Sequence, residues 1–270
     1  MLSIRRSHRP GSATALAVIA VIAVLVSTPS AAEAAGKRIV GLGDSYASGV
    51  GTRTYYAESG SCQRSPYAYP VVDAARVGAT LSFRACSGAT TTSVLNNQLD
   101  TLSSSTTHVT LTVGGNDAGF TKVITTCAQP IWASDCDGVI DQAQSFIKNT
   151  LPSRLNTLYT AVRSNAPNAK VVIVGYPRIF NGEDCNAGTF FSPAEEERLN
   201  ATADLLDTTI RGRADAYRFS SADPRSSFAG HAVCDTTEWV NGLSNPVSES
   251  YHPNRGGQAG YANLVYNHLT

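Results

Sequence analysis

A serine and a histidine, far apart in this sequence, are of the types that an acyl-transfer reaction needs. Such a reaction requires a nucleophile, a base within hydrogen-bond reach and hydrogen-bond donors for the oxyanion. Ser45 follows the apolar run of residues 39–43, where the chain leaves a predicted strand through a glycine-rich turn. His252 lies in a late polar segment. We interpret Ser45 as the candidate nucleophile and His252 as its candidate base.

Two further residues are candidate donors to the oxyanion. The backbone N–H groups of Ser45 and Gly88 and the side-chain amide of Asn116 could each donate a hydrogen bond. Glycine at position 88 leaves its N–H unshielded, and an asparagine amide donates without changing charge. Each residue alone is equally typical of an ordinary turn, because Ser, Gly and Asn all favour turns. The catalytic interpretation therefore depends on their meeting in space.

The apolar pattern predicts elements that could bring them together. Strands are expected over residues 39–43, 80–86, 108–113, 170–175 and 218–219, and helices over 67–77, 93–102, 139–165 with a break near Pro152, 192–217 and 256–269. Residues 118–137 are expected to form a loop. Alternation of strands and helices predicts a doubly wound parallel sheet in a single α/β domain. The carboxyl ends of parallel strands share one edge, so the turns after residues 43, 86 and 113 could meet there.

The N-terminus is typical of a targeting signal. Basic residues at 5–9 precede an unbroken apolar stretch at 15–26, and residues 32–34 (Ala-Glu-Ala) offer a cleavage site. We therefore expect a signal peptide over residues 1–34, read by the general secretory route, and a single catalytic domain over 35–270. An uncleaved anchor is the alternative, although the apolar stretch is short for a membrane span.

Composition excludes some partners. The chain has 270 residues, 16% of them charged, and its formal net charge is zero. This gives no electrostatic footprint for nucleic acid, and none for an anionic membrane. We expect a soluble, extracellular monomer with no membrane-spanning segment after cleavage.

Six cysteines remain after the signal. An even number in an exported chain predicts disulfides. Their spacing suggests pairing between neighbours, namely Cys62–Cys86, Cys127–Cys136 and Cys185–Cys234.

No cofactor or metal is expected. No C-x-x-C pair occurs, and the histidines are scattered without paired spacing. Gly41-x-Gly43 begins a dinucleotide fingerprint, but the third glycine would fall at Tyr46. The residues around Ser45 also lack the G-x-S-x-G pattern of an α/β-hydrolase elbow.

Four short blocks together resemble the SGNH (GDSL-type) hydrolase family. They are Gly43-Asp44-Ser45, Gly88, Gly114-x-Asn116-Asp117 and His252, in family order over residues 38–260. The six cysteines further resemble the secreted actinomycete lipases and esterases of that family. The resemblance implies a three-layer flavodoxin-like fold with helices on both faces of a central parallel sheet. It also implies Ser45 as nucleophile, Gly88 and Asn116 in the oxyanion hole, and His252 as base.

One block departs from the family pattern. Many members carry an Asp three residues before the histidine, and this chain has Glu249 there. Glu249 could orient His252 as a third triad member. Alternatively the backbone carbonyl of Ser250 could accept the imidazole N–H, as in similar secreted actinomycete enzymes, and we favour this alternative.

These observations predict a secreted serine carboxylic-ester hydrolase, a lipase or esterase that works through a Ser–His acyl-enzyme. The resemblance implies an acyl lipid or fatty-acyl ester as substrate, with a phospholipase or a carbohydrate deacetylase as alternatives. A secreted binding module without turnover is the alternative of a different class.

Overall fold

Five parallel strands form the centre of the fold. The computed structural model describes residues 2–3 and 36–270, and only 36–270 are considered below; the expected signal peptide otherwise lies outside the described residues. The strands are β1 (Arg38–Gly43), β2 (Thr80–Phe83), β3 (His108–Thr112), β4 (Lys170–Val174) and β5 (Ser220–Ala222). Their order is β2-β1-β3-β4-β5, the flavodoxin-like order. The predicted fold class is confirmed.

The central strands are buried after their first residue because helices cover both of their faces. In β4 the four residues from Val171 to Val174 are all buried, as are the five from Ile39 to Gly43 in β1. Such continuous apolar runs are typical of a parallel sheet buried on both sides. Ile39 pairs with Leu81 of β2 on one side and with His108 of β3 on the other.

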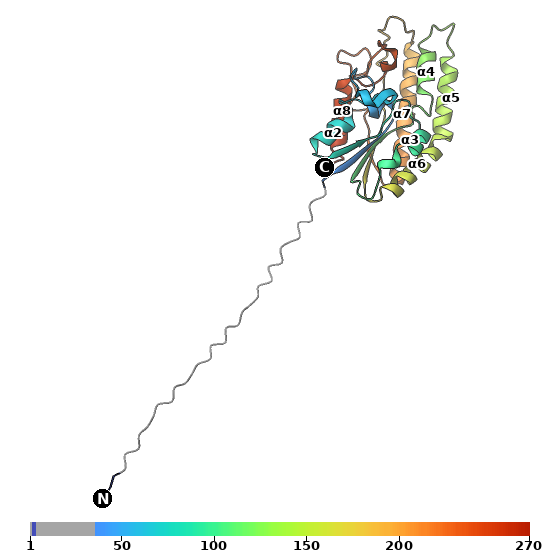
Figure 1. Cartoon of the computed structure of the whole chain (residues 1–270). Helices are drawn as coiled ribbons and strands as arrows, with labels where there is room; N and C mark the ends of the chain where they lie inside the picture. Colours follow the sequence, from blue (N-terminus) through green and yellow to red (C-terminus); the bar gives the residue numbers. More distant parts are fainter. Residues whose placement is uncertain (1, 4–35) are drawn as a thin grey trace. The chain divides into compact units, whose positions relative to one another are not determined.

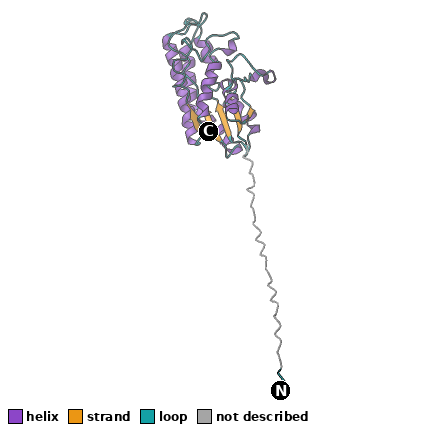
Figure 2. Ribbon diagram, turned by 90° about the vertical axis from the view of Figure 1, so that its left-hand side faces the viewer, coloured by secondary structure: helices purple, strands orange, loops and turns teal. Residues whose placement is uncertain are grey.

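Eight α-helices and three short 3-10 helices accompany the sheet in residues 36–270. They are α1 (Ser45–Ser48), α2 (Tyr69–Arg76), α3 (Thr91–Asn97), α4 (Phe120–Cys127), α5 (Cys136–Asn149), α6 (Leu151–Asn165), α7 (Pro193–Ala216), α8 (Arg255–Tyr266), and the 3-10 turns Ala57–Cys62, Leu99–Thr101 and Val247–Glu249. Helices α2 and α8 pack together on one face, and α3, α5, α6 and α7 cover the other (Figure 1). Figure 2 shows the strands between these helical layers. No helix in this part of the chain combines the length and apolar character that a bilayer span requires.

The expectation of a loop over residues 118–137 is wrong, because α4 occupies Phe120–Cys127. Its buried residues Val123, Ile124 and Cys127 have the i, i+1, i+4 spacing of an amphipathic helix. The glycines and the Asn-Asp pair that precede the segment are typical of turns, and they favour the prediction of a loop.

The last strand lies two residues later than predicted. Arg218 has a positive φ of 55° and therefore cannot continue a strand. Phe219 instead packs its ring on Tyr159 and Tyr217. The strand β5 is the polar sequence Ser220-Ser221-Ala222, and it pairs with β4.

Helix ends follow capping chemistry. Helix α7 begins with a capping box, whose two members are Ser192 and Glu195. Thr150 separates α5 from α6, and Pro152 sits in the first turn of α6. Asn254 caps the start of α8, because its side chain accepts the Gly257 N–H.

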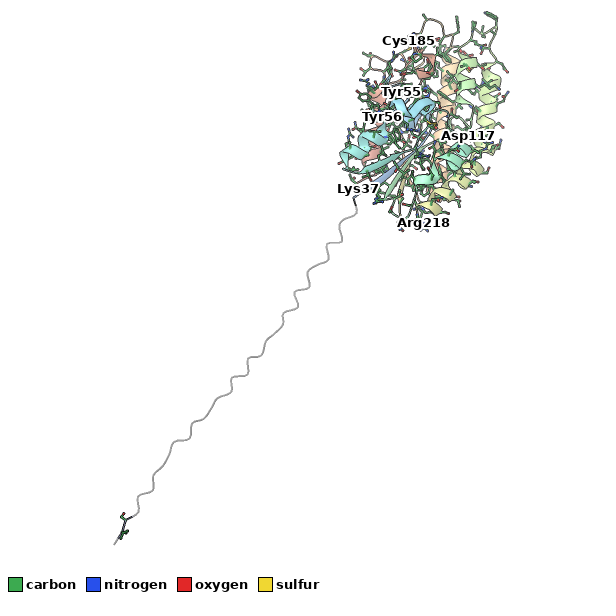
Figure 3. All side chains as sticks on the ribbon, in the orientation of Figure 1. Lys37, Tyr55, Tyr56, Asp117, Cys185 and Arg218 are labelled. Carbon is green, nitrogen blue, oxygen red and sulfur yellow. A yellow bond between two sulfur atoms is a disulfide. The ribbon has the colours of Figure 1, made fainter. Side chains whose placement is uncertain are left out.

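The five parallel strands all run in one direction, so their amino ends and their carboxyl ends lie at opposite ends of the domain. Lys37 and Arg218, which precede β1 and β5, lie at the lower end in Figure 3, whereas Tyr55 and Cys185 lie at the upper end. Helix α1 and the long connections therefore gather at the carboxyl ends of the strands. The switch point of this topology lies between β1 and β3, where a parallel α/β sheet places its ligand site.

Candidate active site

Ser45 is the first residue of the one-turn helix α1. Gly43 ends β1 with a φ of 130°, and a Cβ there would collide with the carbonyl oxygen of Thr112. The Asp44 N–H donates to that same oxygen at 3.0 Å. Asp44 then caps α1, because its Oδ1 accepts the Tyr46 N–H at 2.9 Å. Glycine and aspartate thus fix the tight turn that presents Ser45.

A buried tyrosine ties this turn to the turn after β3. The Tyr176 hydroxyl donates to Asp44 Oδ2 and accepts the Gly115 N–H at 3.2 Å. Burial raises the pKa of Asp44 to about 7, although the hydrogen bonds from Tyr176 and from the Tyr46 N–H act in the opposite direction. Burial and the Asp44 charge raise the pKa of Tyr176, which stays protonated. Tyr176 therefore locks the ends of β1 and β3 together.

The His252 imidazole lies between the Ser45 hydroxyl and a backbone carbonyl. Its Nε2 is 2.9 Å from Ser45 Oγ, and its Nδ1 is 2.8 Å from the Ser250 oxygen. Because a carbonyl only accepts, Nδ1 carries the hydrogen and Nε2 is left to accept the serine proton. Burial lowers the pKa of His252 to about 4, and the bond to the Ser250 carbonyl opposes this shift. The ring is therefore neutral near pH 7.

The Glu249 carboxylate is hydrogen-bonded to Tyr55. Its Oε1 accepts the Tyr55 hydroxyl hydrogen at 2.7 Å, while Oε2 is buried without a partner among the described residues. The side chain makes no hydrogen bond to His252. Of the two groups considered from the sequence, only the Ser250 carbonyl is in contact with the imidazole.

The loop that carries His252 is held by the helix that carries Ser45. The Tyr46 hydroxyl donates to the Tyr251 carbonyl at 2.8 Å. Tyr251 has a positive φ of 59°, and its N–H donates to the Asn241 carbonyl at 2.8 Å. The Asn241 N–H in turn donates to the His252 carbonyl at 3.0 Å. The Tyr46 ring lies 5.4 Å from the imidazole, between centroids. Positions 45 and 252 are thus fixed to each other through Tyr46.

Gly88 and Asn116 lie on adjoining turns. Gly88 has a φ of 77°, which disfavours other residues, and Asn116 Nδ2 donates to the neighbouring Ala89 carbonyl at 3.1 Å. The Cys86 N–H donates to the Gly43 oxygen at 3.0 Å and thereby joins this turn to the end of β1. Among the described residues, the N–H groups of Ser45 and Gly88 have no protein acceptor.

Residues 42–259 match the model of the GDSL-like lipase/acylhydrolase family. This chain belongs to that family. A lipase from Streptomyces rimosus is 40% identical over 259 residues, which are 94% of this chain and 96% of the relative. The resemblance to SGNH hydrolases is confirmed.

Two solved structures are similar over most of their length. A phospholipase A1 from Streptomyces albidoflavus has a TM-score of 0.82 and 41% identity, over 86% of this chain and 99% of that one. An extracellular lipase from Streptomyces rimosus has a TM-score of 0.81, with 41% identity and the same shares of both chains.

Two buried glutamines support the site of this GDSL-like chain. Gln98 accepts the Gly43 N–H at 2.8 Å and donates to the Gly43 carbonyl at 2.9 Å. Gln258 accepts the Tyr69 N–H at 2.9 Å and donates to the Tyr46 carbonyl at 3.0 Å. Sequence reasoning missed both, and also missed Tyr176, because an isolated polar residue on a helix or loop carries no motif. They satisfy backbone groups that the turns leave unpaired.

An apolar cavity and a groove adjoin the serine. The cavity, of about 70 Å³, is lined by Tyr46 and Gly115 near the site and by residues of α4, α5 and α7, among them Ile147 and Ala203. The groove contains His252 and runs between α4 and the loops around residues 188 and 247. Phe120 lines both spaces. The site thus lies beside room for an apolar group.

Disulfides hold the loops around the site. The three bonds are Cys62–Cys86, Cys127–Cys136 and Cys185–Cys234. One group of possible metal ligands lies close together in the described part of the chain, formed by Cys185, Cys234 and Glu238. Its two sulfurs are those of the third disulfide, so the group offers one carboxylate.

Proposed function

We infer that this chain is an exported serine ester hydrolase that cleaves acyl esters of the lipase and esterase class. The observation that supports this most strongly is the chain of contacts from Ser45 Oγ through His252 to the Ser250 carbonyl. A neutral imidazole, held in the tautomer that accepts a serine proton, is the activating group of a serine hydrolase. Membership in the GDSL-like family supports the same reaction class.

The proposed reaction has two halves. Ser45 Oγ attacks the ester carbonyl carbon while His252 Nε2 takes the hydroxyl proton. The N–H groups of Ser45 and Gly88 and the Asn116 amide stabilise the oxyanion. As the tetrahedral intermediate collapses, the C–O bond to the alcohol breaks and His252 returns its proton to that oxygen. Water then attacks the acyl carbon while His252 takes one of its protons. The bond from that carbon to Ser45 Oγ breaks, His252 returns the proton to Oγ, and the acid is released.

The Ser250 carbonyl has a limited role in this scheme. It fixes the ring orientation and the tautomer, and its partial negative charge stabilises the imidazolium that forms during each half reaction. A carboxylate would stabilise that cation more strongly. The acceptor is a backbone atom, so no side-chain substitution removes it.

An acyl chain is the substrate part that suits the neighbouring cavity. Tyr46 and Gly115, which adjoin positions 45 and 116, line it, and its other walls are almost wholly apolar. The similar proteins named a lipase and a phospholipase A1 support acyl lipids as substrates. A carbohydrate deacetylase would need polar side chains around its sugar, whereas Phe120, Ile124, Leu243 and Val247 are among the residues that line the groove beside His252.

Export and a monomeric state belong to the same proposal. The signal over residues 1–34, three disulfides and similarity to a lipase described as extracellular all support secretion. Mature protein recovered from the culture medium should begin close to residue 35, as N-terminal sequencing would reveal. A mature form that begins at residue 1 would refute cleavage.

Hydrolysis of p-nitrophenyl esters by the wild type and by Ser45→Ala tests the reaction. The wild type should show a burst of p-nitrophenol as acyl-enzyme accumulates, and the variant should lose turnover by about 1000-fold or more. Equal rates for the two proteins would refute a serine hydrolase and favour the binding module without turnover.

A further inference from the structure

Large apolar side chains stand exposed around the groove that contains His252. Ile131 is 87% exposed, Trp132 85%, Val247 68% and Phe190 55%. They come from three separate segments, which we call the rim: residues 123–134, 185–194 and 239–248. Exposed apolar side chains gathered from several loops mark an interaction surface more often than scattered single ones do.

The rim surrounds the entrance to the groove. Ala128 from the first segment, Gly188 and Thr189 from the second, and Leu243 and Val247 from the third all line the groove. The loop between α4 and α5 projects at the upper end of Figure 1, and Cys185, which begins the second segment, is labelled at the same end in Figure 3. A partner that binds the rim must therefore also cover the groove that contains His252.

Charge is missing from the rim. None of the three segments contains Asp, Glu, Lys or Arg, although 16% of the whole chain is charged. The first charged residues beyond the first segment are Lys122 and Asp135. A surface without charge enters an uncharged, weakly hydrated environment at low cost in desolvation, and it gains nothing from anionic headgroups.

The tip of the first segment holds Ile131 and Trp132 in an exposed position. The Cys127–Cys136 bond closes the loop at its base. Within it, the Ala133 N–H donates to the Pro130 carbonyl at 2.8 Å, and the Ser134 hydroxyl donates to Thr126. Ile131 and Trp132 are thereby fixed in an outward turn, and less conformational entropy is lost when they are buried.

We propose that the rim docks this protein on a neutral lipid–water interface, with Trp132 and Ile131 inserted among the lipids. The proposal rests on the proposed function only in that the ester substrate lies within the lipid aggregate. A protein partner seated on the rim would close the groove, whereas a lipid surface covers the rim and supplies the substrate. Tryptophan is suited to this position, because its ring is amphipathic.

Tryptophan fluorescence reports on the rim directly. The chain has two tryptophans: Trp132 is 85% exposed, whereas Trp239 is half-buried and stacks on His231 with ring centroids 3.9 Å apart. In the Ser45→Ala variant, vesicles of pure phosphatidylcholine should shift the emission to the blue, and Trp132→Phe should remove that shift. Binding should change by less than about twofold when salt is raised, because no counterions are released. Addition of anionic phosphatidylglycerol should not tighten it.

A paired variant tests what the rim contributes to turnover. Ile131→Ser with Trp132→Ser should weaken partition onto phosphatidylcholine vesicles by about tenfold or more, since each large apolar side chain contributes roughly that factor. Hydrolysis of the vesicle lipid should fall in parallel, while p-nitrophenyl acetate turnover, measured in solution, stays within about twofold. Tyr266→Ser on α8, a residue 37% exposed that does not line the groove, is the matched control and should change neither quantity.

Unchanged partition in the paired variant would overturn the docking surface, as would binding that requires anionic lipid or disappears in salt. A wild type that binds the vesicles through Trp132 but cleaves no soluble ester would instead refute the proposed function and leave the docking surface standing.

Discussion

Glu249→Gln distinguishes the two groups that could orient the His252 imidazole. Gln keeps the shape of the side chain and an oxygen that can accept the Tyr55 hydroxyl hydrogen, which the carboxylate accepts at 2.7 Å. It removes the negative charge and puts an NH2 group in place of Oε2, which has no partner among the described residues. Because His252 Nδ1 contacts the Ser250 carbonyl at 2.8 Å, the imidazole should keep its tautomer and orientation.

The expected cost is small and falls mainly on stability. A hydrogen bond to a charged group contributes about 1.5–3 kcal/mol and a neutral one about 0.5–1.5 kcal/mol, so the substitution should lower the free energy of unfolding by about 1 kcal/mol. Since 1.4 kcal/mol corresponds to a tenfold change in an equilibrium or rate constant, kcat should fall by less than about fivefold even if half of this reached the transition state.

The assay is kcat for a p-nitrophenyl ester at saturation and neutral pH, with folding checked by thermal unfolding. Tyr55→Phe is the matched control, because it removes the partner of Glu249 and leaves the carboxylate charged. It should lower the melting temperature and leave kcat nearly unchanged. A loss of kcat on the order of 1000-fold in a folded Glu249→Gln protein is the result expected of a triad carboxylate, and it would refute the role given to the Ser250 carbonyl.

Three further predictions concern pH, the cavity and a buried carboxyl. Since burial lowers the pKa of His252 to about 4, kcat/KM should stay high as pH falls through 6.5 and should decline only toward that value; a decline centred at 6.5 would contradict the buried base. Ala203→Leu, at the half-buried wall of the apolar cavity, should lower kcat/KM progressively for longer acyl chains, while Ala201→Leu outside the cavity should not; equal effects on acetyl and decanoyl esters would contradict an acyl site there. Burial raises the pKa of Asp73, whose two oxygens lack partners in the described part of the chain, from 3.8 to about 8, so its ionisation destabilises the folded state as pH rises between these values. Asp73→Asn should therefore raise the melting temperature more above pH 8 than near about pH 5, and an equal gain at both would contradict that pKa.

The fold was predictable because its strands carry strong local signals. Continuous apolar runs such as residues 170–174 and the capping box at Ser192 determine their elements with little help from tertiary structure. Strand β5 was misplaced because Ser220 and Ser221 are weak strand formers, and only pairing with β4 makes them a strand. Helix α4 was not predicted because it is only eight residues long and follows a run of glycine, Asn and Asp residues that is typical of a loop.

The site was predictable at its motif residues and not around them. Ser45 and His252 belong to short sequence motifs that occur in the order typical of the family. The structure brings the two side chains within hydrogen-bond distance. Tyr176 and Tyr55 have no such context. Tyr55 meets Glu249 across 194 residues of sequence, and no local motif marks the pair; the carboxylate hydrogen-bonds to Tyr55 and not to the imidazole. Whether a carboxylate three residues before a histidine orients it depends on such long-range partners, which a local pattern does not contain.

Covalent trapping tests the central claim most directly, namely that Ser45 is a nucleophile activated by neutral His252. The protein should be treated with a fluorophosphonate and its peptides mapped by mass spectrometry. We predict a single adduct, on Ser45, that is absent from Ser45→Ala and forms on the order of 1000-fold more slowly in His252→Ala. An adduct on another residue, or labelling of Ser45 at the same rate without His252, would contradict the account.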